Sequence, residues 1–147
     1  MLHGLCCRDA MAPFILDTTL CVAPYLSMES RGNVGQRNIG HQVWRHAPVV
    51  TSNYVIDETV TWLRYHVRHR AAVAFRETLT EARAAHGLHV EWVSERIEGE
   101  AWDVFLRYSD HELSFTDCTS AVIARELGLL VWAYDRDFST LGFQLVG

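Results

Sequence analysis

The chain has 147 residues and a formal net charge of −5, and 49% of its residues are hydrophobic. These values are typical of one globular domain, and they argue against a disordered chain, two large domains or a strongly basic nucleic-acid binder. No stretch approaches the ~20 consecutive apolar residues of a membrane span, so we expect no membrane association.

The N-terminus and the cysteines bear on localisation. Residues Met1–Ala10 have too short an apolar run and too little positive charge for a signal peptide. We expect them to be an irregular leader before a single domain at residues 11–147. Cys6 and Cys7 are adjacent and poorly placed to pair, and no C-x-x-C motif occurs. This pattern favours the reducing cytoplasm.

The first predicted strand is Phe14–Leu16, which ends at Asp17 and turns into a helix. Pro24 limits that helix or lies in its first turn. The Gly-, Asn- and Ser-rich run Ser30–Gly40 predicts a loop, and His41–His46 a short helix.

A brief strand at Pro48–Val50 leads into two predicted helices. The first is capped by Thr51 or Ser52 and runs to about His69, and the second spans Ala71–Ala85 and stops before Gly87. Its residues expected in the core are Val73, Phe75, Leu79 and Ala82.

The next predicted strand is Leu88–Val93, and Ser94–Glu98 opens a helix with acidic residues in its first turns. The inner face of this helix is expected to hold Trp102, Phe105, Leu106 and Tyr108.

A further helix is expected to begin after a cap at Ser114 or Thr116 and to stop at Gly128. Its apolar face is predicted from Ala121, Val122, Ala124 and Leu127. The continuous apolar run Leu129–Ala133 is typical of a buried parallel strand. A last strand is predicted at Phe143–Val146.

Strands and helices therefore alternate, which predicts a three-layer α/β/α domain with a small, mostly parallel sheet. Four acids fall at strand ends or helix starts: Asp17, Glu58, Asp117 and Asp135. Ligands of such sheets bind beyond the carboxyl ends of the strands. Carboxylates that gather there repel one another unless cations neutralise them. The pattern predicts a Mg²⁺ or Mn²⁺ site able to bind a phosphodiester and activate a water.

Each acid also has a structural explanation, since Asp117 suits a helix N-terminus and Asp135 suits a turn. Asp57 and Glu58 are neighbours that point about 100° apart on a helix, and we assign Glu58 to the site. Asp137 is expected to cap a helix.

Other reactive side chains are assigned structural roles. His66 and His69 are three residues apart on one predicted helix, but no third metal ligand is near in sequence. Cys118 is expected to pack as a small hydrophobe. The tryptophans expected in the core are Trp62, Trp92, Trp102 and Trp132.

Three segments resemble the PIN-domain family and, within it, the VapC-like toxins: TSNYVIDET, LSFTDCTSAVIARELGL and AYDRDFSTLGF. The conserved acids of the family would be Asp17 in FILDTT, Glu58 in VIDET, Asp117 in FTDC and Asp135 in YDRDF.

The resemblance implies a Mg²⁺- or Mn²⁺-dependent endoribonuclease that acts on RNA, is blocked by a small antitoxin protein and forms a homodimer. Thr19 would take the position of the hydroxyl residue often found after the first acid. Four arginines are candidates to contact an RNA phosphate: Arg64, Arg68, Arg107 and Arg136. Taken singly, each is better explained as a solvated surface residue.

Two alternatives stay open. The segment Leu20–Ala47 contains a proline and several glycines where the family has a clean helix, which leaves room for a non-catalytic PIN-like binding module. An aspartyl-phosphate phosphatase would use Asp17 as its nucleophile. Such enzymes generally carry a second Asp two residues later, and Thr19 stands there, which counts against this reading.

Overall fold

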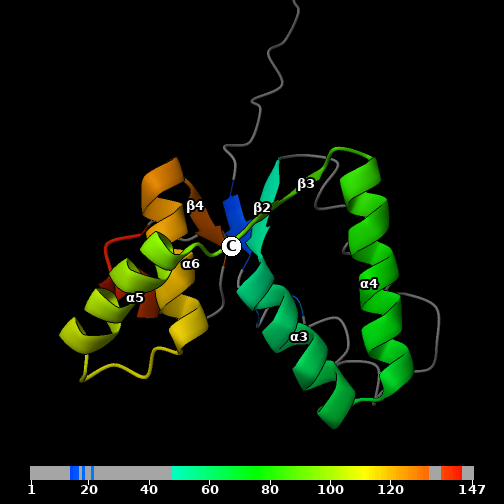
Figure 1. Cartoon of the computed structure of the whole chain (residues 1–147), viewed down its shortest axis with the longest axis horizontal. Helices are drawn as coiled ribbons and strands as arrows, with labels where there is room; N and C mark the ends of the chain where they lie inside the picture. The colour runs from blue at the N-terminus through cyan, green and yellow to red at the C-terminus, as the bar shows by residue number, and fades with distance from the viewer. Residues whose placement is uncertain (1–13, 17, 19–20, 22–47, 133–136, 144–147) are drawn as a thin grey trace, which may run out of the picture.

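Residues 14–16, 18, 21, 48–132 and 137–143 are described by the computed structural model, in which a parallel sheet lies between two pairs of helices (Figure 1). The strands are β1 (Phe14–Leu16), β2 (Val49–Ser52), β3 (Leu88–Glu91) and β4 (Leu130–Trp132). The helices are α3 (Asn53–His66), α4 (His69–Ala84), α5 (Glu95–Arg107), α6 (Phe115–Leu127) and the short α7 (Asp137–Thr140).

The strand order is β3-β2-β1-β4, and every pairing is parallel. Ile15 in β1 lies opposite Val50 in β2 and Val131 in β4. From β1, the chain first forms β2 and β3 on one side of that strand, and it later forms β4 on the other side. This reversal of strand order at β1 is where parallel sheets bind ligands, outside the carboxyl ends of the strands.

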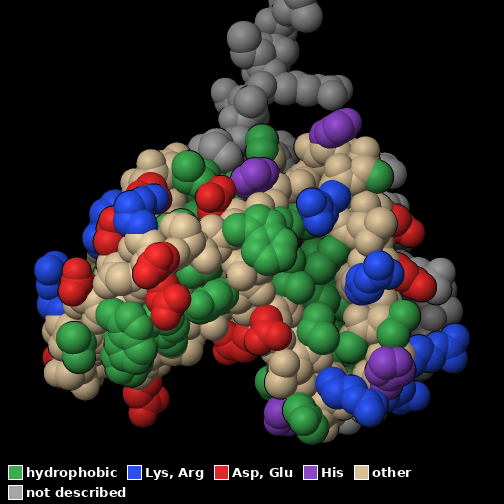
Figure 2. Space-filling view, in the orientation of Figure 1, with side chains coloured by type: hydrophobic (Ala, Val, Ile, Leu, Met, Phe, Trp, Pro, Cys, Tyr) green, Lys and Arg blue, Asp and Glu red, His purple; other side chains and the backbone are tan. Residues whose placement is uncertain are grey.

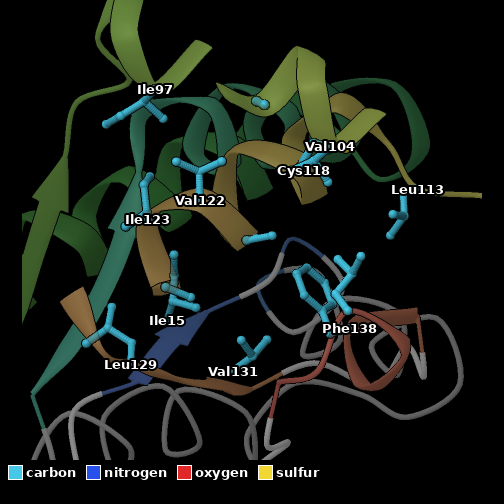
Figure 3. Close-up of a cluster of buried hydrophobic side chains, with 14 of the residues drawn as sticks. Ile15, Ile97, Val104, Leu113, Cys118, Val122, Ile123, Leu129, Val131 and Phe138 are labelled. Atoms are coloured by element: carbon cyan, nitrogen blue, oxygen red, sulfur yellow. The ribbon is translucent and has the colours of Figure 1, made fainter. Parts of the chain in front are cut away.

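Alternate residues of the strands face opposite helix pairs, as the two-residue period of a strand requires. Ile15, Val50 and Val131 pack with α5 and α6 in the larger core cluster (Figure 3). Val49 and Leu130 pack on the other face, with α3 and α4. The predicted three-layer α/β/α fold with a parallel sheet is confirmed.

Serine hydroxyls fix the start of three helices. Ser52, Ser94 and Ser114 precede α3, α5 and α6, and each accepts a hydrogen bond from the backbone N–H three residues later. Such a cap satisfies one of the otherwise unpaired N–H groups of the first turn. The predicted caps at Ser52 and Ser114 are therefore confirmed.

Helix ends differ from the prediction around the turn between α3 and α4. The first helix ends at His66, not near His69, and the extended backbone of Arg68 separates it from α4. The two histidines consequently belong to different helices. His86, which follows α4, has a φ of 56° and takes a left-handed conformation that is uncommon for a residue other than glycine.

The predicted inner face of α5 is wrong except at Tyr108, which is partly buried against the larger core cluster. The buried residues are Ile97, Ala101 and Val104, whereas Trp102, Phe105 and Leu106 are exposed. The exposed side chains that we also expected in the core are Val73, Trp92 and Leu127.

The reason lies in the closely packed surface of α6. Cys118, Ala121 and Ala124 of α6 are small and fully buried, and α5 packs against this helix. Ala101 fits such a close contact, whereas an indole ring does not. Trp102 instead lies at the side, with its ring centroid 4.6 Å from that of Phe115.

Several predictions fall on residues that the structure does not describe. They are the leader Met1–Ala10, the loop Ser30–Gly40, the short helix His41–His46 and most of the last strand. Phe143 is described and is not in a strand. The single domain at residues 11–147 stays a prediction. In the described part of the chain, no helix is both long and apolar enough to cross a bilayer.

Two glycines provide a matched test of the helix boundaries. Gly128 ends α6 with a φ of 63°, a left-handed conformation that strains any residue with a Cβ, so Gly128→Ala is expected to cost about 1 kcal/mol. Gly99 lies inside α5, where an added Cβ would meet nothing within 4 Å. Gly99→Ala is expected to stabilise by about 0.5–1 kcal/mol. Urea unfolding of both variants measures the difference, and equal effects would contradict these assignments.

Candidate functional site

Glu58 lies in the second turn of α3, which begins directly after β2. Its side chain is half-buried, and the Thr18 hydroxyl donates a long hydrogen bond of 3.4 Å to Glu58 Oε2. Thr18 comes two residues after the end of β1. This contact brings the start of α3 to the carboxyl end of the central strand.

Asp117 is held in the first turn of α6 by a reciprocal cap. The Ser114 N–H donates to Asp117 Oδ2 at 2.9 Å, and the Asp117 N–H donates to Ser114 Oγ at 3.1 Å. A carboxylate is also favoured here by the helix dipole. The structural role that the sequence allows for Asp117 is therefore real, and it fixes the orientation of the side chain.

The helices that carry Glu58 and Asp117 both begin at the same edge of the sheet, although the two acids are far apart in the sequence. The helix α6 leads back into β4, so its N-terminus lies toward the carboxyl ends of the parallel strands, where α3 also starts. The two helices pack against each other. Figure 2 shows a hollow between the α5–α6 half and the α3–α4 half, with acidic side chains at its edge.

An open pocket of about 410 Å³ occupies this part of the surface. Its lining comes from six residues of α3 and one of α6: Asp57, Glu58, Thr61, Trp62, Tyr65, His66 and Thr116. Thr116 directly precedes Asp117. The pocket therefore has Glu58 on one side and the N-terminus of α6 on the other.

The remaining predicted site residues, Asp17, Thr19, Asp135 and Arg136, lie outside the described residues. The strands that lead to them end side by side, because Leu16 pairs with Trp132. That Asp17 and Asp135 join the other two acids stays a prediction.

The described half of the site has the donor chemistry of a hard cation site. Glu58 and Asp117 supply carboxylate oxygens, which Mg²⁺ and Mn²⁺ prefer. One turn after Asp117, the hydroxyl of Ser120 is buried and has no hydrogen-bond partner among the described residues. Across these residues, no group of three or more His, Cys, Asp or Glu side chains could hold a metal. A set of three or more such ligands would have to include residues outside the described ranges, and Asp17 and Asp135 stay the predicted ones.

Cys118 is a small apolar side chain of the core rather than a nucleophile. Its side chain is fully buried in the core cluster. Burial, and to a smaller extent the charge of Asp117, raises the pKa of the Cys118 thiol to about 11. The thiol stays protonated and unreactive at neutral pH, so its predicted packing role is confirmed.

The sequence did not point to the aromatic part of the pocket. Its lining includes Trp62, Tyr65 and His66, and we had assigned Trp62 to the core in preference to base stacking. Their spacing from Glu58, four, seven and eight residues on, is the signal that would have placed them on its side of α3.

A model of the PIN domain family matches residues 14–144 of the chain. A curated relative, the 23S rRNA-specific endonuclease VapC20 of Mycobacterium tuberculosis, is 38% identical over 117 residues, which cover 76% of this chain and 86% of that protein. The VapC ribonuclease of Archaeoglobus fulgidus is 34% identical over 89 residues, which cover 60% of this chain and 54% of that one.

Solved structures agree with this match. The crystal structure of M. tuberculosis VapC20, described as a sarcin-ricin loop cleaving toxin, has a TM-score of 0.67 and 32% identity, covering 88% of this chain and 95% of that one. VapBC-1 from nontypeable Haemophilus influenzae has a TM-score of 0.58 and 17% identity, covering 91% and 96%. The second likeness concerns the fold alone.

Proposed function

The chain belongs to the PIN-domain family, and from that premise we propose that it is a metal-dependent endoribonuclease, the toxin of a toxin–antitoxin pair. The observation that carries the proposal is that Glu58 and the start of the Asp117 helix border one pocket at the carboxyl edge of the sheet. The ribonuclease names of the VapC relatives support RNA as the substrate.

The proposed metal ligands are Glu58 and Asp117, together with Asp17 and Asp135. When bound, Mg²⁺ or Mn²⁺ would neutralise a phosphodiester, lower the pKa of a water and stabilise the leaving oxygen. The chain itself fixes the carboxylates in advance. The Ser114 cap holds Asp117, and the Thr18 hydroxyl restrains Glu58. Prior positioning of this kind lowers the entropy lost when substrate and catalytic groups are brought together.

The partners that we propose follow from the same relationship. Several structural neighbours are VapBC complexes of a toxin with its antitoxin. We propose a small antitoxin protein as the partner of this chain, a homodimer as its assembly and the cytoplasm as its location. We also propose that Thr19 and Arg136, which lie outside the described residues, contact the RNA.

Chelation provides the direct test. A labelled 23S rRNA fragment containing the sarcin-ricin loop, and total RNA, would be incubated with the protein in Mg²⁺. We expect EDTA to lower the initial cleavage rate by on the order of 100-fold or more, and Mn²⁺ to restore it. Glu58→Gln removes one anionic ligand, so neither metal should restore the cleavage rate of this variant.

Glu81→Gln is the matched control, because Glu81 is exposed on α4 and does not line the pocket. It should cleave at the parental rate. Equal cleavage with and without EDTA would refute the metal-dependent mechanism. No cleavage of either RNA, together with no Mn²⁺ binding by calorimetry, would favour the non-catalytic binding module.

A further inference from the structure

One side of α3 joins a carboxylate to a row of rings. Three side chains lie three, four and seven residues after Glu58: Thr61, Trp62 and Tyr65. This spacing places them on the same face of the helix as Glu58. All four line the pocket. The pocket is therefore continuous from the proposed catalytic edge to an aromatic surface.

The rings form an ordered platform. The ring centroids of Trp62 and His66 are 4.7 Å apart with an interplanar angle of 12°, so the two rings are stacked. His66 Nδ1 donates to the Trp62 carbonyl oxygen at 3.1 Å, which fixes the imidazole. Beside them, Tyr65 is 81% exposed. Exposed rings of this kind offer flat apolar faces to a ligand.

Positive charge follows at the far end of the same helix. Arg68, His69 and Arg70 are exposed at the turn into α4. No described carboxylate lies within ion-pairing distance of the two arginines. Figure 2 shows basic side chains and histidines gathered at this end of the α3–α4 half. The chain as a whole has a net charge of −5 and would repel a polyanion. This local basic patch is therefore the feature that makes the α3 side of the surface suitable for one.

We propose that this side of α3 is a nucleotide-stacking subsite for RNA, a proposal that rests on the proposed function. An unstacked base lies against Trp62 and Tyr65, and the neighbouring phosphate points toward Arg68 and Arg70. Stacking on aromatic side chains is how proteins hold bases that have left a helix, and it tolerates any base. The subsite would therefore position a flexible or extruded nucleotide next to Glu58 without selecting its identity.

RNA fits this surface better than a protein segment does. The surface combines flat rings with two arginines that form no ion pair with the described carboxylates, and it adjoins the edge at which a phosphodiester must bind for hydrolysis. An apolar protein helix would leave Arg68 and Arg70 without a partner. Loss of antitoxin binding with unchanged RNA binding is accordingly one of the results that would overturn the proposal.

The test measures binding separately from cleavage. In a Glu58→Gln background, fluorescence anisotropy would follow a single-stranded RNA oligonucleotide and the same oligonucleotide with abasic riboses at its centre. We expect Trp62→Ala and Tyr65→Ala each to weaken binding of the first oligonucleotide by on the order of tenfold. Trp62→Phe should stay within about threefold. With the abasic oligonucleotide, all these variants should bind alike.

Trp92→Ala is the matched control, because Trp92 is an exposed tryptophan outside the pocket. It should bind both oligonucleotides like the parent. Arg68→Ala should reduce the dependence of log K on log salt concentration by about 0.7, as expected for one lost phosphate contact. Tyr65→Ala and the Trp62 variants are checked for folding by circular dichroism, and the high exposure of Tyr65 makes its truncation safe for the fold.

Binding of Tyr65→Ala and Trp62→Ala that equals the parent would overturn the proposal, as would equal losses with intact and abasic RNA. A failure of the proposed function looks different. In that case the otherwise unchanged protein fails to cleave RNA in Mg²⁺, while the base-dependent loss of binding in the ring variants is still measured.

Discussion

Asp117→Asn is expected to lower RNA cleavage by on the order of 10²–10³-fold while leaving the fold intact. The substitution removes a negative charge from the proposed cation site but keeps an oxygen at the same position. That oxygen can still accept the hydrogen bond from the Ser114 N–H, so the start of α6 is preserved. Initial cleavage rates in Mg²⁺, combined with urea unfolding, separate the two effects.

Asp117→Ala is the informative companion, because it removes the charge together with the side-chain half of the reciprocal cap, the hydrogen bond from the Ser114 N–H. It should lose activity as Asp117→Asn does and should also lose about 1 kcal/mol of stability. Asp103→Asn serves as a control, since Asp103 is exposed on α5 and lies outside the pocket. Near-parental cleavage by Asp117→Asn would exclude Asp117 from the chemistry and leave it the capping role alone.

Phe138→Ala is expected to destabilise the protein by about 3–5 kcal/mol. Phe138 is only 1% exposed, and it packs in the larger core cluster with Ile15 and Val131 (Figure 3). Its ring also meets that of Phe143 edge-on, with centroids 6.4 Å apart. Truncation removes these contacts and leaves a cavity that a four-residue helix cannot close. Urea unfolding measures the loss.

Leu106→Ala is the matched control, because Leu106 is 69% exposed on α5, and we expect a change within about 0.5 kcal/mol. Phe138 follows Asp135 by three residues, so its truncation should also reduce cleavage under conditions in which the variant remains folded. An effect on stability no larger than that of Leu106→Ala would mean that α7 does not anchor the core.

The fold was predictable where local signals agreed with one another. At Ser52, Ser114 and Gly128, a capping residue stands at the boundary of an apolar pattern, and the helix boundaries follow from it. The face of α5 was not predictable in the same way. Its large rings suggest burial, but the small residues of the neighbouring α6 decide which side fits, and that is tertiary information.

The site was predictable in part. Glu58 and Asp117 were predicted as site residues because each lies near the start of a helix, and both helices begin at the same edge of the sheet; their roles stay a prediction. The aromatic half was missed because Trp62 is adjacent to the fully buried Leu63. From the sequence, a tryptophan beside a core position can be assigned either to the core or to the surface. Only the packing of α4 against α3 shows that one side of Trp62 is left for the pocket.

The pairing of β1 with β4 joins two segments that are far apart in the sequence, because Ile15 lies opposite Val131. A ribosome delivers the N-terminal segment first, and the central strand has no neighbour on its β4 side until the C-terminal segment has been synthesised. An unfinished polypeptide therefore lacks half of the edge at which the proposed catalytic acids gather. Activity of the proposed site would therefore require that β4 has been synthesised and has paired with β1.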